Sequence, residues 1–343
     1  MTKYFLTAIL ALLLFINTDC KKDILTPEEI KPGSRNYTWT VDTIYGPYNP
    51  FTSITGSSPT DLWTANPGDA EKIFYHYDGV KWTTDLIPRS FSPFSIISLG
   101  QNNVWSAGDL GSIWKYDGSK WKEQLRLALG TDSIRPVFDD MYGFSENDIY
   151  ATGICFASDQ TKWGIIYHYD GNSWKQIDIP KISTNFIKIR ESNNGKLYLR
   201  GVTDEQFIES TYQLYEFDGT TLTQIKSGTQ ANDQFGSIVE LDDKIYFIIG
   251  FDLFDYVNSN FIKLARLSDL SEFLNVGFGR SVKDVFLGMR NGIAHYNGTN
   301  TEYLIKTEEN TFVRTGIIFA KDVFMMGRDQ KGNNLIYHGK LNE

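Results

Sequence analysis

Hydrophobic and polar residues alternate in short runs along most of this chain, with turn-forming residues between the runs. The clearest example is GSIWKYDGSKW, residues 111–121, in which large apolar side chains take alternate positions before an Asp-Gly pair. Alternation with a period of two is typical of a half-buried β-strand. Asp-Gly favours a type I′ turn, in which both central residues have positive φ. The pattern therefore predicts a β-hairpin whose return strand opens at Trp121.

The same unit recurs along the whole chain. Further copies are IFYHYDGVKW (73–82), IIYHYDGNSW (165–174), LYEFDGTTL (214–222) and GIAHYNGTN (292–300), with weaker copies at 253–261 and 335–340. A strand with one aromatic anchor precedes each copy; the anchors are Trp63, Trp105, Tyr150, Tyr198, Tyr246, Phe286 and Phe324, spaced 38 to 48 residues apart. A period of roughly 40–50 residues, with several strands and a turn signal in each repeat, is typical of a β-propeller.

Most anchors also follow a short apolar segment, which gives each repeat four strands: an inner strand A, the aromatic strand B, and the two hairpin strands C and D. Seven anchors predict an all-β fold of seven four-stranded antiparallel blades. The last repeat lacks strand D, and YTWTVDTI at residues 37–44 reads as a strand D without a preceding strand C. We therefore expect this N-terminal strand to close the last blade, because closure protects sheet edges from unwanted pairing.

The first 19 residues have the pattern of a signal peptide. Lys3 precedes an almost wholly apolar run at residues 4–16, which is too short to span a bilayer because spanning takes ~20 residues. CKKD, residues 20–23, resembles the start of lipoproteins from Bacteroidota-type bacteria, and this resemblance implies lipidation at Cys20 and a place in the outer membrane, on its periplasmic or cell-surface side. The expected organisation is a lipoprotein signal peptide at 1–19, a charged tether at 20–35 and the propeller at 36–343.

Composition narrows the range of functions. The formal net charge of −9, with no block of Lys and Arg, argues against a nucleic-acid-binding surface. The four histidines, His76, His168, His295 and His338, stand at one position of strand C in four repeats, which indicates a structural role on an outer strand. Cys155 has no expected disulfide partner and is interpreted as a buried small apolar residue.

Catalytic patterns are weak. Glycoside hydrolysis needs two carboxylates roughly 5–10 Å apart, and no pair of acids stands at a recognisable spacing. AGDLGSIW (107–114) and SIRPVF (133–138) are the nearest sequences to the Asp-box and Arg-Ile-Pro stretches of sialidases, and both miss the pattern. We assign no catalytic residue, no metal site and no cofactor, and favour a non-enzymatic role.

The connections between strands supply the one positive indication of function. In a four-stranded blade the B–C and D–A connections open on one face of the ring, and the length variation in this chain falls in them. Variable loops on a rigid scaffold usually carry function. The predicted binding face consists of Arg135, Asp139, Asp140, Asp159, Lys162, Asp204, Glu205, Glu209, Arg290 and Arg328.

The repeat, seen most clearly in NVWSAG…KYDGSKW and DIYATG…HYDGNSW, resembles a family of exported bacterial propeller repeats of mostly unassigned function, loosely akin to the kelch and Asp-box groups. The resemblance implies a fold rather than an activity. Three hypotheses follow: an anchored, monomeric propeller that binds a protein or glycan through the D–A/B–C face, a polysaccharide-acting enzyme with its site at the channel mouth, or a structural subunit of an envelope complex.

Overall fold

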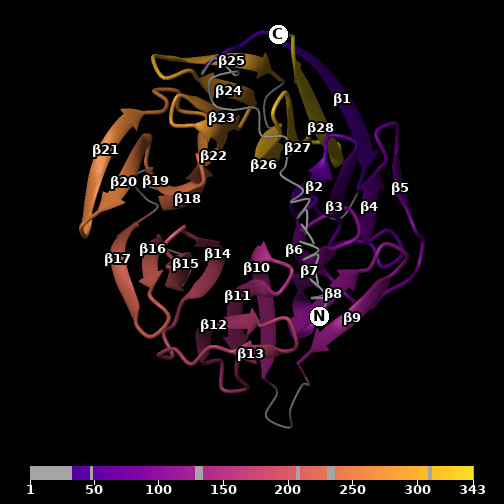
Figure 1. Cartoon of the computed structure of the whole chain (residues 1–343), viewed down its shortest axis with the longest axis vertical. Helices are drawn as coiled ribbons and strands as arrows, with labels where there is room; N and C mark the ends of the chain where they lie inside the picture. Colours follow the sequence, from indigo (N-terminus) through magenta and orange to yellow (C-terminus); the bar gives the residue numbers. More distant parts are fainter. Residues whose placement is uncertain are drawn as a thin grey trace, which may run out of the picture.

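The computed structural model describes residues 33–46, 49–127, 134–205, 209–229, 236–307 and 311–342, apart from the side chains of residues 204, 205, 209 and 210. These residues form seven four-stranded antiparallel sheets, arranged as the blades of a ring (Figure 1), as in a β-propeller, whose blades surround a central channel. The sequence prediction of a seven-bladed, all-β propeller is confirmed.

The blades follow one another along the chain, each with its strand A nearest the channel. Blade 1 contains β2 (Ile54–Ser58), β3 (Asp61–Ala65), β4 (Phe74–Tyr77) and β5 (Trp82–Thr84); blade 2 contains β6 (Pro93–Ser98), β7 (Val104–Gly108), β8 (Ser112–Tyr116) and β9 (Trp121–Arg126). Blade 3 contains β10 (Arg135–Ser145), β11 (Asp148–Phe156), β12 (Lys162–Tyr169) and β13 (Trp174–Gln176); blade 4 contains β14 (Asn185–Glu191), β15 (Leu197–Glu205), β16 (Glu209–Phe217) and β17 (Leu222–Thr229). Blade 5 contains β18 (Gly236–Leu241), β19 (Lys244–Ile249), β20 (Asp252–Val257) and β21 (Asn260–Arg266); blade 6 contains β22 (Phe273–Ser281), β23 (Asp284–Met289), β24 (Gly292–Tyr296) and β25 (Thr301–Lys306).

Blade 7 joins the two ends of the chain. It contains β26 (Phe312–Ile318), β27 (Asp322–Arg328), β28 (Asn333–Leu341) and, as its outer strand, β1 (Tyr37–Tyr45). β1 runs antiparallel to β28, with Cα partners from Tyr37↔Leu341 to Tyr45↔Asn333. The predicted closure by the N-terminal strand is confirmed.

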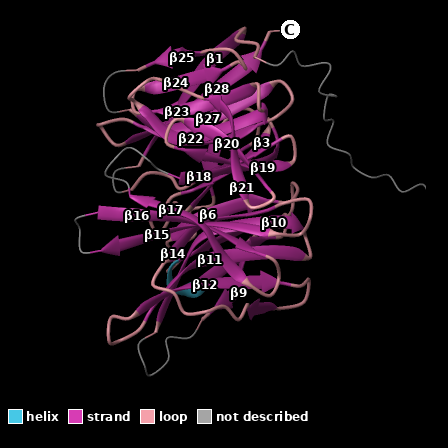
Figure 2. Ribbon diagram, turned by 90° about the vertical axis from the view of Figure 1, so that its left-hand side faces the viewer, coloured by secondary structure: helices cyan, strands magenta, loops and turns pink. Residues whose placement is uncertain are grey.

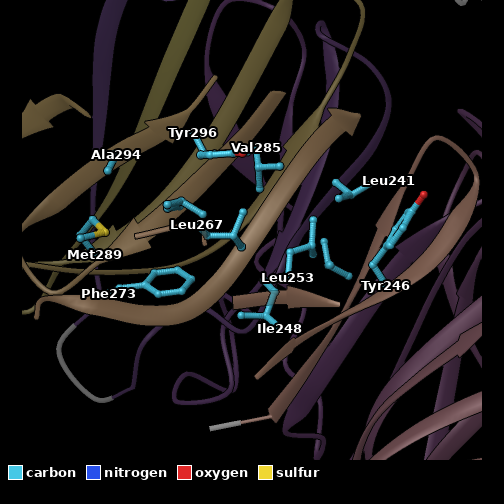
Figure 3. Packing of buried hydrophobic residues seen from close by; sticks show 12 residues of the cluster. Leu241, Tyr246, Ile248, Leu253, Leu267, Phe273, Val285, Met289, Ala294 and Tyr296 are labelled. Atoms are coloured by element: carbon cyan, nitrogen blue, oxygen red, sulfur yellow. The ribbon is translucent and has the colours of Figure 1, made fainter. Parts of the chain in front are cut away.

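The core lies between neighbouring blades rather than at the centre of the ring. Between blades 5 and 6, Ile248 and Leu253 of one sheet pack with Val285 and Leu287 of the other (Figure 3). Trp105 and Phe286, two of the aromatic anchors, are completely buried in equivalent layers. The ring can therefore exceed the size of an ordinary single core, because each pair of blades buries its own apolar layer.

The Asp-Gly turns differ from the sequence prediction. In blade 1 the ladder ends at Tyr77↔Trp82, so residues 78–81 form a four-residue loop in which Asp78 Oδ1 accepts the N–H groups of Val80 and Lys81. Only the glycine of each Asp-Gly pair has positive φ, as at Gly79 with +91°. The hairpin was predicted correctly and its type I′ turn wrongly, because an Asp side chain that caps the turn removes the need for two positive φ angles.

A type I′ turn occurs instead in the most degenerate repeat. In blade 5 the ladder ends at Val257↔Asn260, and the two residues between them, Asn258 and Ser259, have φ of 49° and 62°. Two positive φ angles in a two-residue loop define this turn.

The two faces of the ring are distinct. The loop face carries the B–C and D–A connections, and the turn face carries the A–B turns and the C–D hairpin turns; Figure 2 shows the ring from the side. The short helix η1 (Asp109–Gly111) lies in a B–C connection. None of the described residues form a helix long and apolar enough to cross a membrane.

The chain joins the ring on the turn-face side. Arg35 Nη2 donates to the carbonyls of His295 (3.0 Å) and Asn300 (2.8 Å), and its Nη1 lies 3.1 Å from a carboxylate oxygen of Glu302. These partners flank the hairpin turn of blade 6. Arg35, the last residue of the expected tether, is therefore held against the ring.

Candidate functional site

The four histidines form one repeated arrangement. Each histidine Nε2 lies 2.6–2.7 Å from an Asp carboxylate at the start of strand B in its own blade; the pairs are His76–Asp61, His168–Asp148, His295–Asp284 and His338–Asp322. Each ring also packs on the aromatic anchor of that strand, with ring centroids 4.0–4.6 Å apart. The Asp orients the ring and the anchor covers it. These histidines therefore join strands B and C of their blades, as the sequence indicated.

The copy in blade 6 is the most buried. The side chains of His295 and Asp284 are 0% and 3% exposed, and Arg280 Nη1 donates to the same carboxylate at 2.9 Å. Burial alone would raise the pKa of Asp284, but the hydrogen bond from His295 and the charge of Arg280 hold that pKa below its ordinary value. Arg280 also donates to the carbonyl of Phe319, just after the inner strand of blade 7, and to the hydroxyl of Tyr37 on its outer strand. The cluster therefore connects blade 6 to blade 7.

Three blades replace the Asp–His pair. In blade 4 Lys196 Nζ lies 2.7 Å from Glu216, which takes the histidine position. Blade 5 has the same reversed polarity, with Lys244 beside Asp255 at 2.5 Å. In blade 2 the ammonium of Lys115 lies 4.8 Å from the centroid of Trp105. Six blades thus pair a charged or polar group of strand C with one of strand B, and in blade 2 a lysine on the anchor ring takes its place, so histidine is one of several solutions.

Three residues of the predicted binding face lie at strand ends or between strands of blade 3. Arg135 opens β10, Asp159 lies in the β11–β12 connection, and Lys162 opens β12 opposite Phe156. Arg135 is exposed, and Asp159 accepts hydrogen bonds from the hydroxyl and N–H of Thr161, which lower its pKa.

Two further arginines lie on this face, and both contact other residues of the same chain. Arg290 Nε lies 3.3 Å from Glu272, and the guanidinium stacks 5.2 Å from the centroid of Phe312. Arg328 Nη2 donates to the Gly46 carbonyl at 3.1 Å. Asp204, Glu205 and Glu209 were also predicted here, and their side chains lie outside the described part of the chain.

Asp139 and Asp140 differ from the prediction, which placed them in a D–A loop. Both lie inside β10, the inner strand of blade 3, at a β-bulge between Phe138 and Asp140. The strand starts at Arg135, so the loop is shorter than the sequence indicated. A bulge adds one residue to the strand and re-aims its side chains, and it brings these carboxyl groups to the inner wall of the ring.

The inner strands are joined by a relay of side-chain to backbone hydrogen bonds. The hydroxyl of Ser53 accepts from the N–H of Ile96, that of Ser95 from Met141, and the Asp140 carboxylate from Ile189 at 3.0 Å. Each acceptor belongs to one blade and each N–H to the next blade around the ring. At the equivalent position of blade 4 stands Lys188, which has no acceptor atom when protonated, so the relay ends there.

Asp140 is fully engaged. Its Oδ2 also lies 2.6 Å from Arg190 Nη1, and its Oδ1 accepts from the Ser95 hydroxyl at 3.3 Å. Asp139 Oδ2, by contrast, is buried without a hydrogen-bond partner. Burial, reinforced by the neighbouring charge of Asp140, raises the pKa of Asp139 to about 6.

Cationic residues of blade 4 complete this sector of the channel and were missed by the sequence reading. Lys188 and Arg190 alternate with apolar residues in β14, and Arg200 lies on β15. Burial lowers the pKa of Lys188 to about 7 and that of Arg200 to about 10. The available signal was a cation inside an otherwise apolar segment, FIKI at residues 186–189.

Cys155 is a buried free thiol packed with Trp105, Phe138 and other apolar residues. Burial raises its pKa, which disfavours the reactive thiolate. Among the residues that the structure describes, no three His, Cys, Asp or Glu side chains are grouped closely enough to hold a metal ion.

No family model matches this sequence, and no curated protein matches it. Solved structures do. YCF48 bound to D1 peptide superposes with a TM-score of 0.61 at 16% identity, over 87% of this chain and 96% of that chain. A catalytically inactive virginiamycin B lyase from Staphylococcus aureus with quinupristin gives 0.61 at 12%, over 88% and 99%. The Pan2 WD40 domain of Neurospora crassa gives 0.59 at 13%, over 90% and 97%. Similarity at these identities shows the β-propeller fold.

Proposed function

We propose that this protein is a non-enzymatic, membrane-anchored β-propeller that binds a partner protein through its loop face. The observation that carries the proposal is a set of aromatic rings at that face. Phe94 is the second residue of β6 and Phe156 is the last residue of β11, and they are 36% and 38% exposed. Aromatic side chains with exposed surface and arginines beside them are enriched where proteins bind proteins.

Cations stacked on rings extend the same surface around the ring. Lys181 Nζ lies 4.3 Å from the centroid of Trp163, and Arg266 covers Phe251 at 5.3 Å. Phe312 has two arginines above it, Arg290 at 5.2 Å and Arg314 at 5.1 Å. A guanidinium already held over a ring loses little conformational freedom when a partner binds. Similar propellers include one solved with a bound peptide, which agrees with a protein partner.

The anchor and the loop face are on opposite sides in this proposal. The chain reaches the ring through Arg35, beside the hairpin turn of blade 6, which belongs to the turn face. A lipid on Cys20 then holds the turn face toward the outer membrane and leaves the loop face open to a partner in the envelope. Replacement of Cys20 by Ala should move the protein from the membrane fraction to the soluble fraction.

Site-specific photo-crosslinking in the native envelope tests the binding face. A photoreactive residue at Phe94 or Phe156 should give discrete adducts with one partner. The same residue at Val80, which is 85% exposed in the β4–β5 turn, is the matched control on the turn face and should give none. Adducts of equal yield from Val80 would contradict the proposal, and adducts only from outer strands of the blades would favour a structural subunit. Adducts with carbohydrate would indicate a glycan ligand.

One observation favours a second candidate, an enzyme that acts on polysaccharide. Asp139 combines a raised pKa of about 6 with a neighbouring carboxyl group, as a general acid requires. Against this reading, Asp140 is already held by Arg190. Turnover of any polysaccharide in a broad panel, lost in Asp139→Asn, would establish the enzyme and remove the first proposal.

A further inference from the structure

Two cations face each other across strands β14 and β15. Lys188 and Arg200 are direct Cα partners in the ladder of blade 4, so their side chains leave the same face of the sheet. Directly opposed residues on antiparallel strands have Cβ atoms about 5 Å apart, and like charges at that separation repel. This pair therefore destabilises the blade unless a negative charge joins it.

The protein supplies no such charge in direct contact. Among the residues that the structure describes, neither Lys188 nor Arg200 forms a hydrogen bond or an ion pair, and Arg200 Nε is buried without a partner. The carboxylate of Asp140, whose charge acts on Lys188, is held by Arg190 at 2.6 Å. An orphaned guanidinium nitrogen in a buried position is costly, because it has lost water and gained no acceptor.

Elsewhere in blade 4, and in the neighbouring blade 5, the chain pairs lysines with acids. Lys196 meets Glu216 across β15 and β16, and Lys244 meets Asp255 across β19 and β20. The chain as a whole carries more acids than bases, with a formal net charge of −9. The unpaired Lys188–Arg200 couple thus departs from the charge pattern of its own surroundings.

The couple also stands where the inner relay of hydrogen bonds ends. Ser53, Ser95 and Asp140 each accept an N–H from the next blade, whereas Lys188 at the equivalent place presents donors instead. Both side chains remain partly open to solvent, and Lys188 is on the inner strand of blade 4. An ammonium and a guanidinium side by side provide donors in number and geometry for one carboxylate or phosphate group.

We propose that Lys188 and Arg200 form a binding site for a single anionic group, a carboxylate or a phosphate, in the channel wall of blade 4. The site uses residues other than those of the loop face and goes beyond the proposed function. Loss of partner crosslinking at the loop face would leave it untouched.

The proposal predicts that anion binding is coupled to protonation of Lys188. The pKa of Lys188 is lowered to about 7, first by burial and then by the charges of Arg190 and Arg200, and it is raised by Asp140 on β10 and Glu240 on β18. A bound anion favours the charged ammonium and raises this pKa. Anion affinity should therefore be highest below pH 7 and fall as the pH rises through about 7 to 9.

Thermal unfolding of the full chain tests the site. Inorganic phosphate and acetate are titrated separately at constant ionic strength, with chloride as the balancing anion. We expect a saturable rise in Tm with one of them: phosphate alone indicates a phosphate site, acetate alone a carboxylate site. Lys188→Met and Arg200→Met should abolish the rise, and Lys188→Arg should retain it. Lys72→Met, at an exposed lysine outside the channel, is the control and should behave as the wild type.

The variant without anion gives a second, independent readout. In chloride alone Lys188→Met should melt above the wild type, because it removes the like-charge repulsion. A merely structural lysine would give a lower Tm instead. The proposal is overturned if neither anion produces a saturable shift, or if the shift persists unchanged in Lys188→Met. Should Arg200→Met fail to fold, the Lys188 variants still decide the question.

Discussion

Strands B and C of this ring and its inner strands A have diverged to different extents. At B and C, four blades repeat the same Asp, aromatic and His arrangement, and two more keep an ion pair with the polarity reversed. The inner strands carry serines in blades 1 and 2, carboxylates in blade 3 and cations in blade 4. The outer region is uniform because every blade must solve the same packing problem. The inner strands do not have to form this common contact, so each blade can carry different polar residues there.

The largest expected effect tests whether the uniform region depends on ring closure. Deletion of residues 36–45 removes β1 and leaves β28 with an unpaired edge. We expect no soluble folded protein, measured by circular dichroism and size-exclusion chromatography. A chain that starts at residue 33 is the control and should fold. If the truncated chain melts like the full one, closure contributes little.

The next prediction compares the Asp–His pair of blade 6, which is buried, with the pair of blade 3, which is partly exposed. Asp284→Ala in blade 6 leaves His295 and Arg280 buried without their carboxylate, which should cost about 3–5 kcal/mol. Asp148→Ala removes the equivalent group in blade 3, where the side chains of Asp148 and His168 are 34% and 32% exposed, and should cost less than about 1 kcal/mol. Urea denaturation measures both. Equal losses would mean that depth does not set the strength of the cluster.

The loss of stability at acid pH gives a second test of the buried cluster in blade 6. The folded-state pKa of Asp284 is lowered, so its contribution is complete above the unfolded value of about 3.9 and is lost as the pH falls through the folded value. Asp284→Asn should therefore flatten the decline in Tm below pH 4. A variant curve parallel to the wild type would contradict the assignment.

A smaller effect of opposite sign is expected on the inner wall. The pKa of Asp139 is raised to about 6, so its ionisation destabilises the folded state progressively as the pH rises from about 4 to 6. Asp139→Asn should match the wild type near pH 4 and exceed it at pH 7 by at most about 3 kcal/mol. Urea denaturation at both pH values checks this. A variant less stable at pH 7 would show that the carboxylate is paired.

The smallest effect concerns the hairpin turns. Asp170→Ala removes the side-chain acceptor for the N–H groups of Asn172 and Ser173 and should lower Tm slightly, because water can replace the lost acceptor at this exposed turn. Ser259→Gly in blade 5 creates an Asn-Gly pair at a residue with φ of 62° and should stabilise by about 0.5 kcal/mol. Thermal unfolding of both variants measures the difference. A destabilised Ser259→Gly would exclude the type I′ assignment.

The repeated sequence pattern was sufficient to predict the features that all blades share. Aromatic anchors at a regular spacing predicted the number of blades, and the unmatched strand at residues 37–44 predicted the closure. The common position of the four histidines predicted their structural role, because a residue repeated in four blades must serve something that the blades share. Asp-Gly predicted the hairpin but not its turn type. The Asp side chain can cap a four-residue loop, and the residue pair alone does not decide between this loop and a type I′ turn.

The inner wall could not be predicted in the same way. β10 begins at Arg135, so Asp139 and Asp140 lie in the strand at a bulge rather than in the expected loop, and a bulge in β14 sets Lys188 opposite Arg200. A shift of one residue moves a side chain to the other face of a sheet. The sequence contains each residue of these sites, whereas their juxtaposition depends on register shifts between strands that carry no clear sequence signal.

The joining of β1 to β28 also orders events during biosynthesis. The ribosome makes β1 first and its partner almost last, so blade 7 stays incomplete until nearly the whole chain has been made. The contact with the greatest sequence separation is then the last to form, which slows the final step. A circularly permuted chain that begins at residue 49, with residue 342 joined to residue 36 by a short linker, would translate β1 directly after β28. We expect such a chain to fold faster than the natural order while reaching the same ring.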